Sequence, residues 1–349
     1  MATLTWVGGG NDSADNPQDW SPAQAPAPGD TLTMPDGTMN ISDNDLKGNT
    51  LQVGTGQSSS GTTTSTLNLS HHAHVSINQP LITNGGDFVT TIDSTGHNAL
   101  TLDAPTGSAP INARSFNVDI ASGGLRGSFT TDNSMVTVTG NGKLLNDSST
   151  FAGSSAVISP AVVGHGSFDV TALPSFMGTV DDGSLEFGGK VGSGQTVTVG
   201  HTMSSIAQQW DTVKIDQPNV FHGSIVMEPS AEVDLVGLGN ADSYRIQDNK
   251  MQFISDSHVI GSLNLTEEAS AGLVVSTNGN DAYVTQQGLS SPPPGSTTLP
   301  EATTADFTNN VVSHSVQRSG GIADSSAHSP YGAVSDIGHP MHDMFISHF

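Results

Sequence analysis

Short runs of alternating apolar and polar residues, separated by Gly, Asn, Asp or Ser, recur along most of the chain. Between about residues 31 and 285 these runs are four to seven residues long, and each places its apolar side chains on one face. Clear examples are Thr31–Met34, Thr66–Leu69, Ala99–Leu102, Val136–Thr139, Thr196–Val199 and Ser262–Leu265. No window sustains helical apolar spacing without an intervening Gly or Pro. The pattern therefore predicts an all-β fold.

Two all-β architectures fit this pattern: tandem β-sandwiches and a right-handed parallel β-helix, a solenoid whose coils stack on one another. Aromatic residues make up 5% of the chain, and narrow solenoid coils fill with aliphatic residues and Thr, whereas sandwich cores depend on large aromatics. We therefore predict a solenoid over residues 31–289, with about ten coils and a length of around 50 Å, and keep tandem sandwiches as the alternative. Its Ser- and Thr-rich face is expected to form ladders.

The two ends of the chain differ from this central region. Residues 1–30 are expected to form an N-terminal cap segment. Residues 290–300 contain three consecutive prolines, which cannot join a ladder, and predict an extended Pro-rich linker. Residues 301–349 are rich in Ser, His and Gly and weakly patterned, so we expect a flexible tail that serves as an export or docking signal.

Composition excludes several classes of function. The chain has 349 residues, no Cys, 9 Lys and Arg against 33 Asp and Glu, and a net charge of -24. Without Cys there are no disulfides and no thiolate metal sites. The negative charge repels nucleic acid and anionic lipid, so no nucleic-acid partner is expected. No apolar run reaches the roughly 18 residues of a membrane span, and the residues from Met1 to Trp6 lack the features of a Sec signal.

Acidic residues in turn-like segments are the candidate metal ligands. They are Asp43 and Asp45, Asp181 and Asp182, and Asp281. Carboxylate oxygens at such turns can hold calcium, and ordinary Asx-turn hydrogen bonding is the competing explanation. His72 and His74 share one face of an expected strand, where they are either a site for a softer divalent ion or a solvated edge.

Two tryptophans mark the N-terminal segment. Trp6 begins Trp6-Val7-Gly8-Gly9-Gly10, Trp20 lies in Asp19-Trp20-Ser21, and Pro26-Ala27-Pro28-Gly29-Asp30-Thr31-Leu32 follows. The two rings are expected to cap the first coil or to form a contact at its open end. Later runs include Gly183–Phe187, Gly194–Val199, Val213–Pro218 and Val233–Leu235.

Together these stretches resemble bacterial exported β-helix repeat proteins of an alphaproteobacterial kind, both autotransporter-like passengers and type I-secreted surface or adhesin-like proteins. They cover roughly a third of the chain. The resemblance implies a β-helix and export, and carries no catalytic motif. The chain departs from it in having Ala231-Glu232 where members often have Gly-Asp, and in lacking a translocator barrel and calcium-binding Gly-Gly-x-Gly-x-Asp repeats. Export is therefore expected by a type I route that needs no Sec signal.

An enzyme needs a converging set of catalytic groups. Asp181, Asp182 and Glu186 form the densest acidic cluster, but adjacent strand residues point to opposite faces. The sequence has no Gly-x-Ser-x-Gly, phosphate-binding loop or His-Glu-x-x-His motif. We therefore predict a non-enzymatic, extracellular structural or adhesive protein of a biofilm matrix or cell surface that self-assembles end to end into filaments, with calcium as the candidate cofactor. The alternatives are a polysaccharide-binding module and a glycan-degrading β-helix enzyme.

Overall fold

The computed structural model describes residues 1–9, 12–43, 45–54, 63–78, 88–104, 114–174, 180–201, 210–266, 272–286 and 293–302. Within these ranges nearly all regular structure is β-strand, which confirms the all-β prediction. The strands form a 15-stranded sheet, here sheet A, a 13-stranded sheet, here sheet B, and a two-stranded hairpin. No helix of the described residues is long and apolar enough to span a bilayer. The tail from residue 303 lies outside the described residues.

Sheet A contains β1 (Thr3–Trp6), β3 (Trp20–Ser21), β4 (Thr31–Met34), β6 (Thr50–Val53), β8 (His74–Asn78), β10 (His97–Ala104), β12 (Gly124–Asp132), β14 (Lys143–Ala152), β16 (Ala161–Val163), β17 (Gly166–Thr171), β21 (Gln195–Val199), β23 (Ser224–Met227), β25 (Ser243–Gln247), β26 (Lys250–Ser255) and β27 (His258–Leu265). Sheet B contains β2 (Asp12–Ser13), β5 (Gly37–Ser42), β7 (Thr63–Ser70), β9 (Phe88–Ser94), β11 (Arg114–Ile120), β13 (Ser134–Thr139), β15 (Ser155–Ile158), β20 (Ser184–Phe187), β22 (Asp211–Ile215), β24 (Ala231–Val236), β28 (Leu273–Asn278), β29 (Asp281–Gln286) and β30 (Thr297–Thr298). The hairpin pairs β18 (Leu173–Pro174) with β19 (Val180–Asp181), and two 3-10 turns are η1 (Pro17–Asp19) and η2 (Pro218–Val220).

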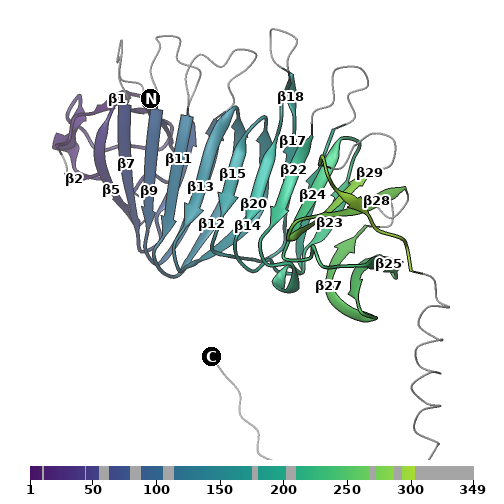
Figure 1. The fold of residues 1–349 in the computed structure, drawn as a ribbon. Coiled ribbons are helices and arrows are strands. Elements are labelled where there is room, and N and C mark those ends of the chain that lie inside the picture. The colour runs from purple at the N-terminus through teal and green to yellow at the C-terminus, as the bar shows by residue number, and fades with distance from the viewer. Residues whose placement is uncertain are drawn as a thin grey trace, which may run out of the picture. The chain divides into compact units, whose positions relative to one another are not determined.

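The main strands alternate between the two sheets from β4 to β24, and each pairs in parallel with the preceding strand of its own sheet (Figure 1). This arrangement follows from the period-2 pattern, because every strand has one apolar face to bury. The inward residues of both sheets form one continuous core cluster that is mostly aliphatic, with Phe side chains at intervals. The mostly parallel pairing differs from the antiparallel pairing of the sandwich alternative.

The corners between the sheets differ in length. Turns that lead from sheet B to sheet A are short near the middle of the chain, where Gly123 has φ +74° and a Cβ there would lie 2.1 Å from the Gly96 carbonyl oxygen. Glycine is required at this corner because any side chain would collide with the backbone of the preceding turn. The longer connections between residues 54–63, 78–88, 104–114 and 201–210 all lead from a sheet A strand to a sheet B strand.

Antiparallel strands follow the parallel ladders at the C-terminal end. Strands β25, β26 and β27 form a meander, and β29 pairs antiparallel with both β24 and β28. Two-residue turns join the meander strands, such as Asp248-Asn249 with φ angles of 51° and 58°. Paired positive φ angles are typical of two-residue hairpin turns. The chain therefore reverses direction here and does not continue the parallel pairing.

Strands are present in two of the predicted end segments. The predicted linker at 290–300 is partly folded: β30 pairs with β28, and Leu299 is buried and donates its backbone N–H to Val275 O at 2.8 Å. Pro293 and Pro294 lie outside the strands, and Thr297 and Thr298 after them pair with β28. The predicted cap at 1–30 is also part of a sheet, because β1 pairs in parallel with β4.

Candidate functional site

The outer face of sheet A carries an in-register row of hydroxyl side chains across ten strands. We call it the hydroxyl row. Its members are Thr3, Thr31, Thr50, Ser76, Thr101, Ser128, Ser148, Ser167, Thr196 and Ser224. Each is exposed or half-buried, so the row faces solvent. Because neighbouring strands lie about 4.8 Å apart, the row is a regular, uncharged array of hydroxyls.

Backbone pairing, more than contact between the hydroxyls, holds this row in place. Ser128 Oγ donates to Ser148 O at 2.9 Å, and the Ser148 and Ser167 hydroxyls lie 3.5 Å apart. In contrast, the hydroxyls of Thr31, Thr50 and Thr101 form no side-chain hydrogen bond with another described residue, and all three residues are exposed. Hydroxyls in this state can exchange water for the polar groups of a partner.

A second polar row lies two residues further along each strand. It includes Thr5, Thr33, Gln52, Asn78, Asp103, Thr130, Thr150, Asp169 and Thr198. The opposite flank of the hydroxyl row is basic, with Lys47, His74, Arg126 and Lys143 near the starts of strands β6 to β14. The chain as a whole has a net charge of -24, so this flank stands out electrostatically.

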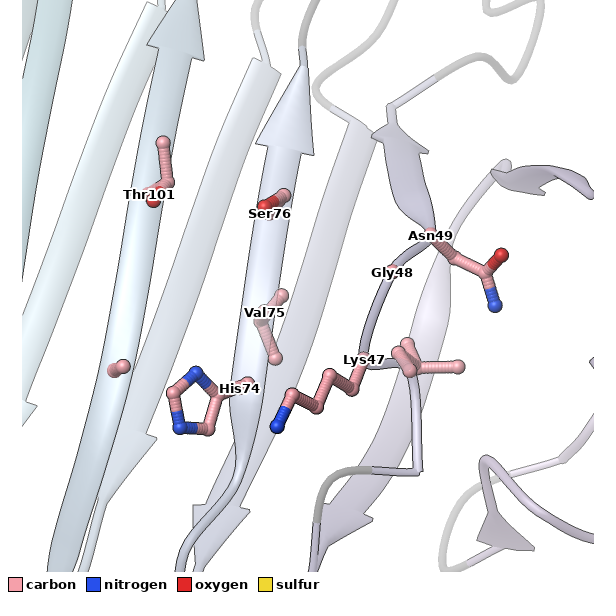
Figure 2. Close-up of a pocket in the computed structure, with 9 residues that line it drawn as sticks. Lys47, Gly48, Asn49, His74, Val75, Ser76 and Thr101 are labelled. Carbon is pink, nitrogen blue, oxygen red and sulfur yellow. The ribbon is translucent and has the colours of Figure 1, made fainter. Parts of the chain in front are cut away.

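Two adjoining hollows lie over the N-terminal half of the hydroxyl row. The smaller, of about 120 Å³, is lined by Lys47, His74, Ser76 and Thr101 among others. Figure 2 shows the Lys47 side chain reaching toward His74, with Ser76 and Thr101 on neighbouring strands.

The larger hollow, of about 320 Å³, is lined by Thr31, Thr50, Gln52 and Asn78 among others. Both hollows share Gly48 and Asn49. Four consecutive members of the hydroxyl row therefore line one shallow depression.

Strand length explains this depression. Strand β6 begins at Thr50, opposite Ser76, so His74 and Val75 on β8 extend beyond its start. The turn that precedes β6 forms one wall, and Asn49 fixes it because its buried side-chain Oδ1 accepts a hydrogen bond from Gly29 N at 3.0 Å. Asp30 fixes the turn that precedes β4, because its carboxylate accepts hydrogen bonds from Ala2 N and Ala27 N. These backbone donors lower the pKa of the Asp30 carboxyl.

The outer face of sheet B has a different character. Its C-terminal half places Glu186, Lys214, Asp234 and Tyr283 in register on neighbouring strands. Lys214 Nζ lies 3.0 Å from Glu186 Oε1 and 3.2 Å from Asp216 Oδ1. Burial, followed by the charge of Asp281, raises the pKa of Asp234 to about 6, and its buried Oδ1 has no hydrogen-bond partner among the described residues. The ionised form of Asp234 is therefore unfavourable on this face of the folded protein.

A corner between the sheets brings several carboxylates close together, as the enzyme alternative requires. Asp211 is fully buried, its Oδ1 accepts from Gly183 N at 2.8 Å, and its Oδ2 lies 2.7 Å from His201 Nδ1. Burial raises the pKa of Asp211, and burial together with the Asp211 charge raises those of Asp169 and Asp182. Because Gly183 N and the His201 ring occupy the two oxygens of Asp211, the arrangement suits the fixing of turns better than proton transfer.

The structure distributes the candidate calcium ligands over separate turns. Asp45 Oδ2 accepts from Ser42 N at 2.9 Å, and Asp281 Oδ1 accepts from Gly237 N at 3.2 Å. Asp43, with φ 47°, lies in an exposed turn, whereas Asp181 and Asp182 lie at the end of β19. Among the residues that the structure describes, no group of three or more His, Asp or Glu is arranged to hold a metal ion. The backbone hydrogen bond of Asp45 fixes a local turn, and that of Asp281 joins two segments that are 44 positions apart.

His72 and His74 do not share a strand as expected. His71 and His72 form a turn, with His71 at φ 59°, and β8 begins at His74. A turn residue with positive φ interrupts the alternation on which the expectation depended.

Trp6 and Trp20 are packed together inside the N-terminal end of the core. Both are buried, and their rings meet edge to face with centroids 5.3 Å apart. Trp20 Nε1 donates to Ala14 O at 2.8 Å, whereas the buried Trp6 Nε1 has no hydrogen-bond partner among the described residues. The rings fill the core at this end and are too buried to contact a partner directly.

Comparison with protein-family models, characterised proteins and solved structures finds no match to the chain. The fold and the outer face of sheet A define an all-β protein with two long, mostly parallel sheets and one regular surface that carries hydroxyl groups. Sequence reasoning anticipated hydroxyl ladders but not their register, the hollows or the basic flank. The in-register Thr-x-Thr runs on β1, β4 and β21 were the available signal.

Proposed function

We propose that this chain is a secreted structural or adhesive protein of a biofilm matrix or cell surface, and that sheets A and B are the sides of a right-handed parallel β-solenoid. The observation that carries the proposal is the hydroxyl row, which continues across ten strands without a charged member. A regular solvent-facing array of this length suits adhesion to an extended partner better than it suits the binding of a small molecule.

Strand connectivity supports the solenoid part of the proposal. Main strands alternate between the sheets and pair in parallel with the previous strand of the same sheet, as successive turns of one solenoid would. The handedness is expected from the general preference for right-handed crossovers. An experimental density map would test it, since a left-handed path or two separate sandwiches would overturn this part.

The sheet edges favour adhesion through a face over assembly end to end. Sheet A ends in β3 and β25, and sheet B ends in β2 and β30; β2, β3 and β30 have two residues each. The edge of the five-residue β25 is partly covered, because Tyr244 N donates to Pro300 O and Ala302 N donates to Tyr244 O. Very short edge strands offer few backbone groups to another chain. We therefore expect isolated particles by negative-stain electron microscopy, with or without millimolar calcium. Filaments would instead support the end-to-end form of this function and make the sheet edges the sites to mutate.

Localisation and adsorption test the function itself. In the organism that produces the chain, an epitope-tagged copy is expected in the extracellular matrix fraction, and the purified protein is expected to adsorb to extracted matrix on a quartz-crystal microbalance. A purely cytoplasmic location, or adsorption no greater than that of serum albumin, would overturn the proposal.

A further inference from the structure

We propose that the depression over the N-terminal half of the hydroxyl row binds an extended polysaccharide that carries carboxylate groups. The inference rests on the proposed adhesive function and names its partner. The sugar hydroxyls would bond to Thr31, Thr50, Ser76 and Thr101, which line the two adjoining hollows. The polymer would run across the strands, along the hydroxyl row.

The choice of an extended partner follows from the row's geometry. Consecutive members lie on hydrogen-bonded neighbouring strands, so the spacing of about 4.8 Å is repeated from strand to strand. A polymer with hydroxyls at regular intervals can form many individually weak hydrogen bonds to such an array, and their sum gives avidity. A small ligand would use only one or two of them.

The choice of carboxylate groups follows from the charges beside the row. Lys47 lines the smaller hollow with His74, and Lys143 lies on the same flank at the start of β14. Both lysines are exposed, and neither forms an ion pair with a described residue. Arg126 also lies on this flank but is paired with Asp147. Lys47 beside the uncharged hydroxyls complements an acidic polysaccharide, and Lys143, on the second strand beyond that of Thr101 in sheet A, continues the basic flank along the path of the polymer. The Asp30 carboxylate, which lines the larger hollow, accepts hydrogen bonds from Ala2 N and Ala27 N and lies 3.9 Å from the N-terminal ammonium group.

The same substitution can be made on both faces of the protein, which provides a matched control. Thr31→Val, Thr50→Val and Thr101→Val remove three hydroxyls of the depression while keeping β-branched side chains that suit strands. Thr38→Val, Thr66→Val and Thr91→Val make the same change in an in-register row on sheet B. For the cations, Lys47→Gln with Lys143→Gln is compared with Lys190→Gln and Lys250→Gln, which are exposed elsewhere.

The experiment measures binding of the full chain to polygalacturonate and to its methyl ester, which has the same backbone without the charge, by biolayer interferometry. We expect polygalacturonate to bind, the ester to bind about tenfold more weakly, and added salt to weaken binding. The sheet A triple variant should lose about tenfold or more in affinity, because each lost hydrogen bond weakens binding at least about twofold. The Lys47/Lys143 variant should lose most of the salt dependence.

Other outcomes overturn the inference. Equal binding of polygalacturonate and its ester would exclude recognition of carboxylates, and equal losses in the sheet A and sheet B variants would exclude the depression as the site. If polygalacturonate fails to bind while the chain still adsorbs to extracted matrix, the inference fails and the proposed function stands. If neither surface retains the chain, both fail.

Discussion

Replacing Asp234 with Asn should stabilise the protein at neutral pH and not at acidic pH. In the folded chain burial and neighbouring acids raise the pKa of this carboxyl from 3.8 to about 6. A carboxyl whose pKa is raised on folding favours the folded state only while it is protonated in that state. Stability is therefore lost as the pH rises from about 4 to about 6, and the loss persists at higher pH.

The size of the effect follows from the pKa shift. A rise of about two pKa units corresponds to roughly 3 kcal/mol of lost stability, since each unit is worth about 1.4 kcal/mol. Because Asp234 is half-buried and solvent screens its charge, we expect about 1–2 kcal/mol. Asn should lose little in return, because the buried Oδ1 of Asp234 has no hydrogen-bond partner among the described residues.

Thermal unfolding followed by circular dichroism at pH 7.5 and at pH 4 tests the reasoning. Asp234→Asn is expected to raise Tm at pH 7.5 by about 2–4 °C, on the scale of about 2 °C per kcal/mol for a large domain, and to change it little at pH 4. Asp36→Asn, in an exposed turn, is the control and should change neither value. An equal gain at both pH values, or a loss at pH 7.5, would refute an electrostatic origin.

Three further predictions concern the same face, the N-terminal core and a corner. Lys214→Gln should lower stability at pH 7.5 by about 0.2–1 kcal/mol and by less at pH 4, measured in the same scans, because it leaves the carboxylates of Glu186 and Asp216 without their shared cation. Trp20→Phe should cost about 1–3 kcal/mol more than Trp6→Phe in urea unfolding, because it also leaves the Ala14 carbonyl unpaired; equal costs would contradict this. Gly123→Ala should prevent soluble expression or strongly lower Tm, whereas Gly164→Ala, which meets no atom within 4 Å, should cost only about 1–2 kcal/mol of backbone strain.

The alternating pattern was sufficient to locate individual strands but not to predict how those strands pair. The alternating run Thr196–Val199 lies within β21, and Ser262–Leu265 lies within β27. The antiparallel meander escaped prediction although its signal was present, in the two-residue turns Asp248-Asn249 and Asp256-Ser257 between alternating runs. Sequence alone does not distinguish these turns from the corners between the two sheets, where positive φ angles also occur, as at Gly123.

The candidate site depended on contacts between residues distant in sequence. Lys47, Ser76 and Thr101 line one hollow, although 54 positions separate the first from the last, because strands β6, β8 and β10 are consecutive in sheet A. The Asp211 carboxylate meets Gly183, 28 positions away, at a corner. Which residues come into contact depends on the number of residues in each connecting turn. The alternation of apolar and polar residues along a strand does not determine that number.

The sequence by itself determined that the chain is all-β, which residues of each strand face inward, and that its surface is rich in hydroxyls and negative charge, because these properties follow from side-chain alternation and composition. Only the tertiary structure decided the strand register, and with it the alignment of ten hydroxyls, the lysines beside them and the raised pKa of Asp234. Register is set by backbone pairing and by packing in a shared core, and those interactions join residues that the sequence keeps apart.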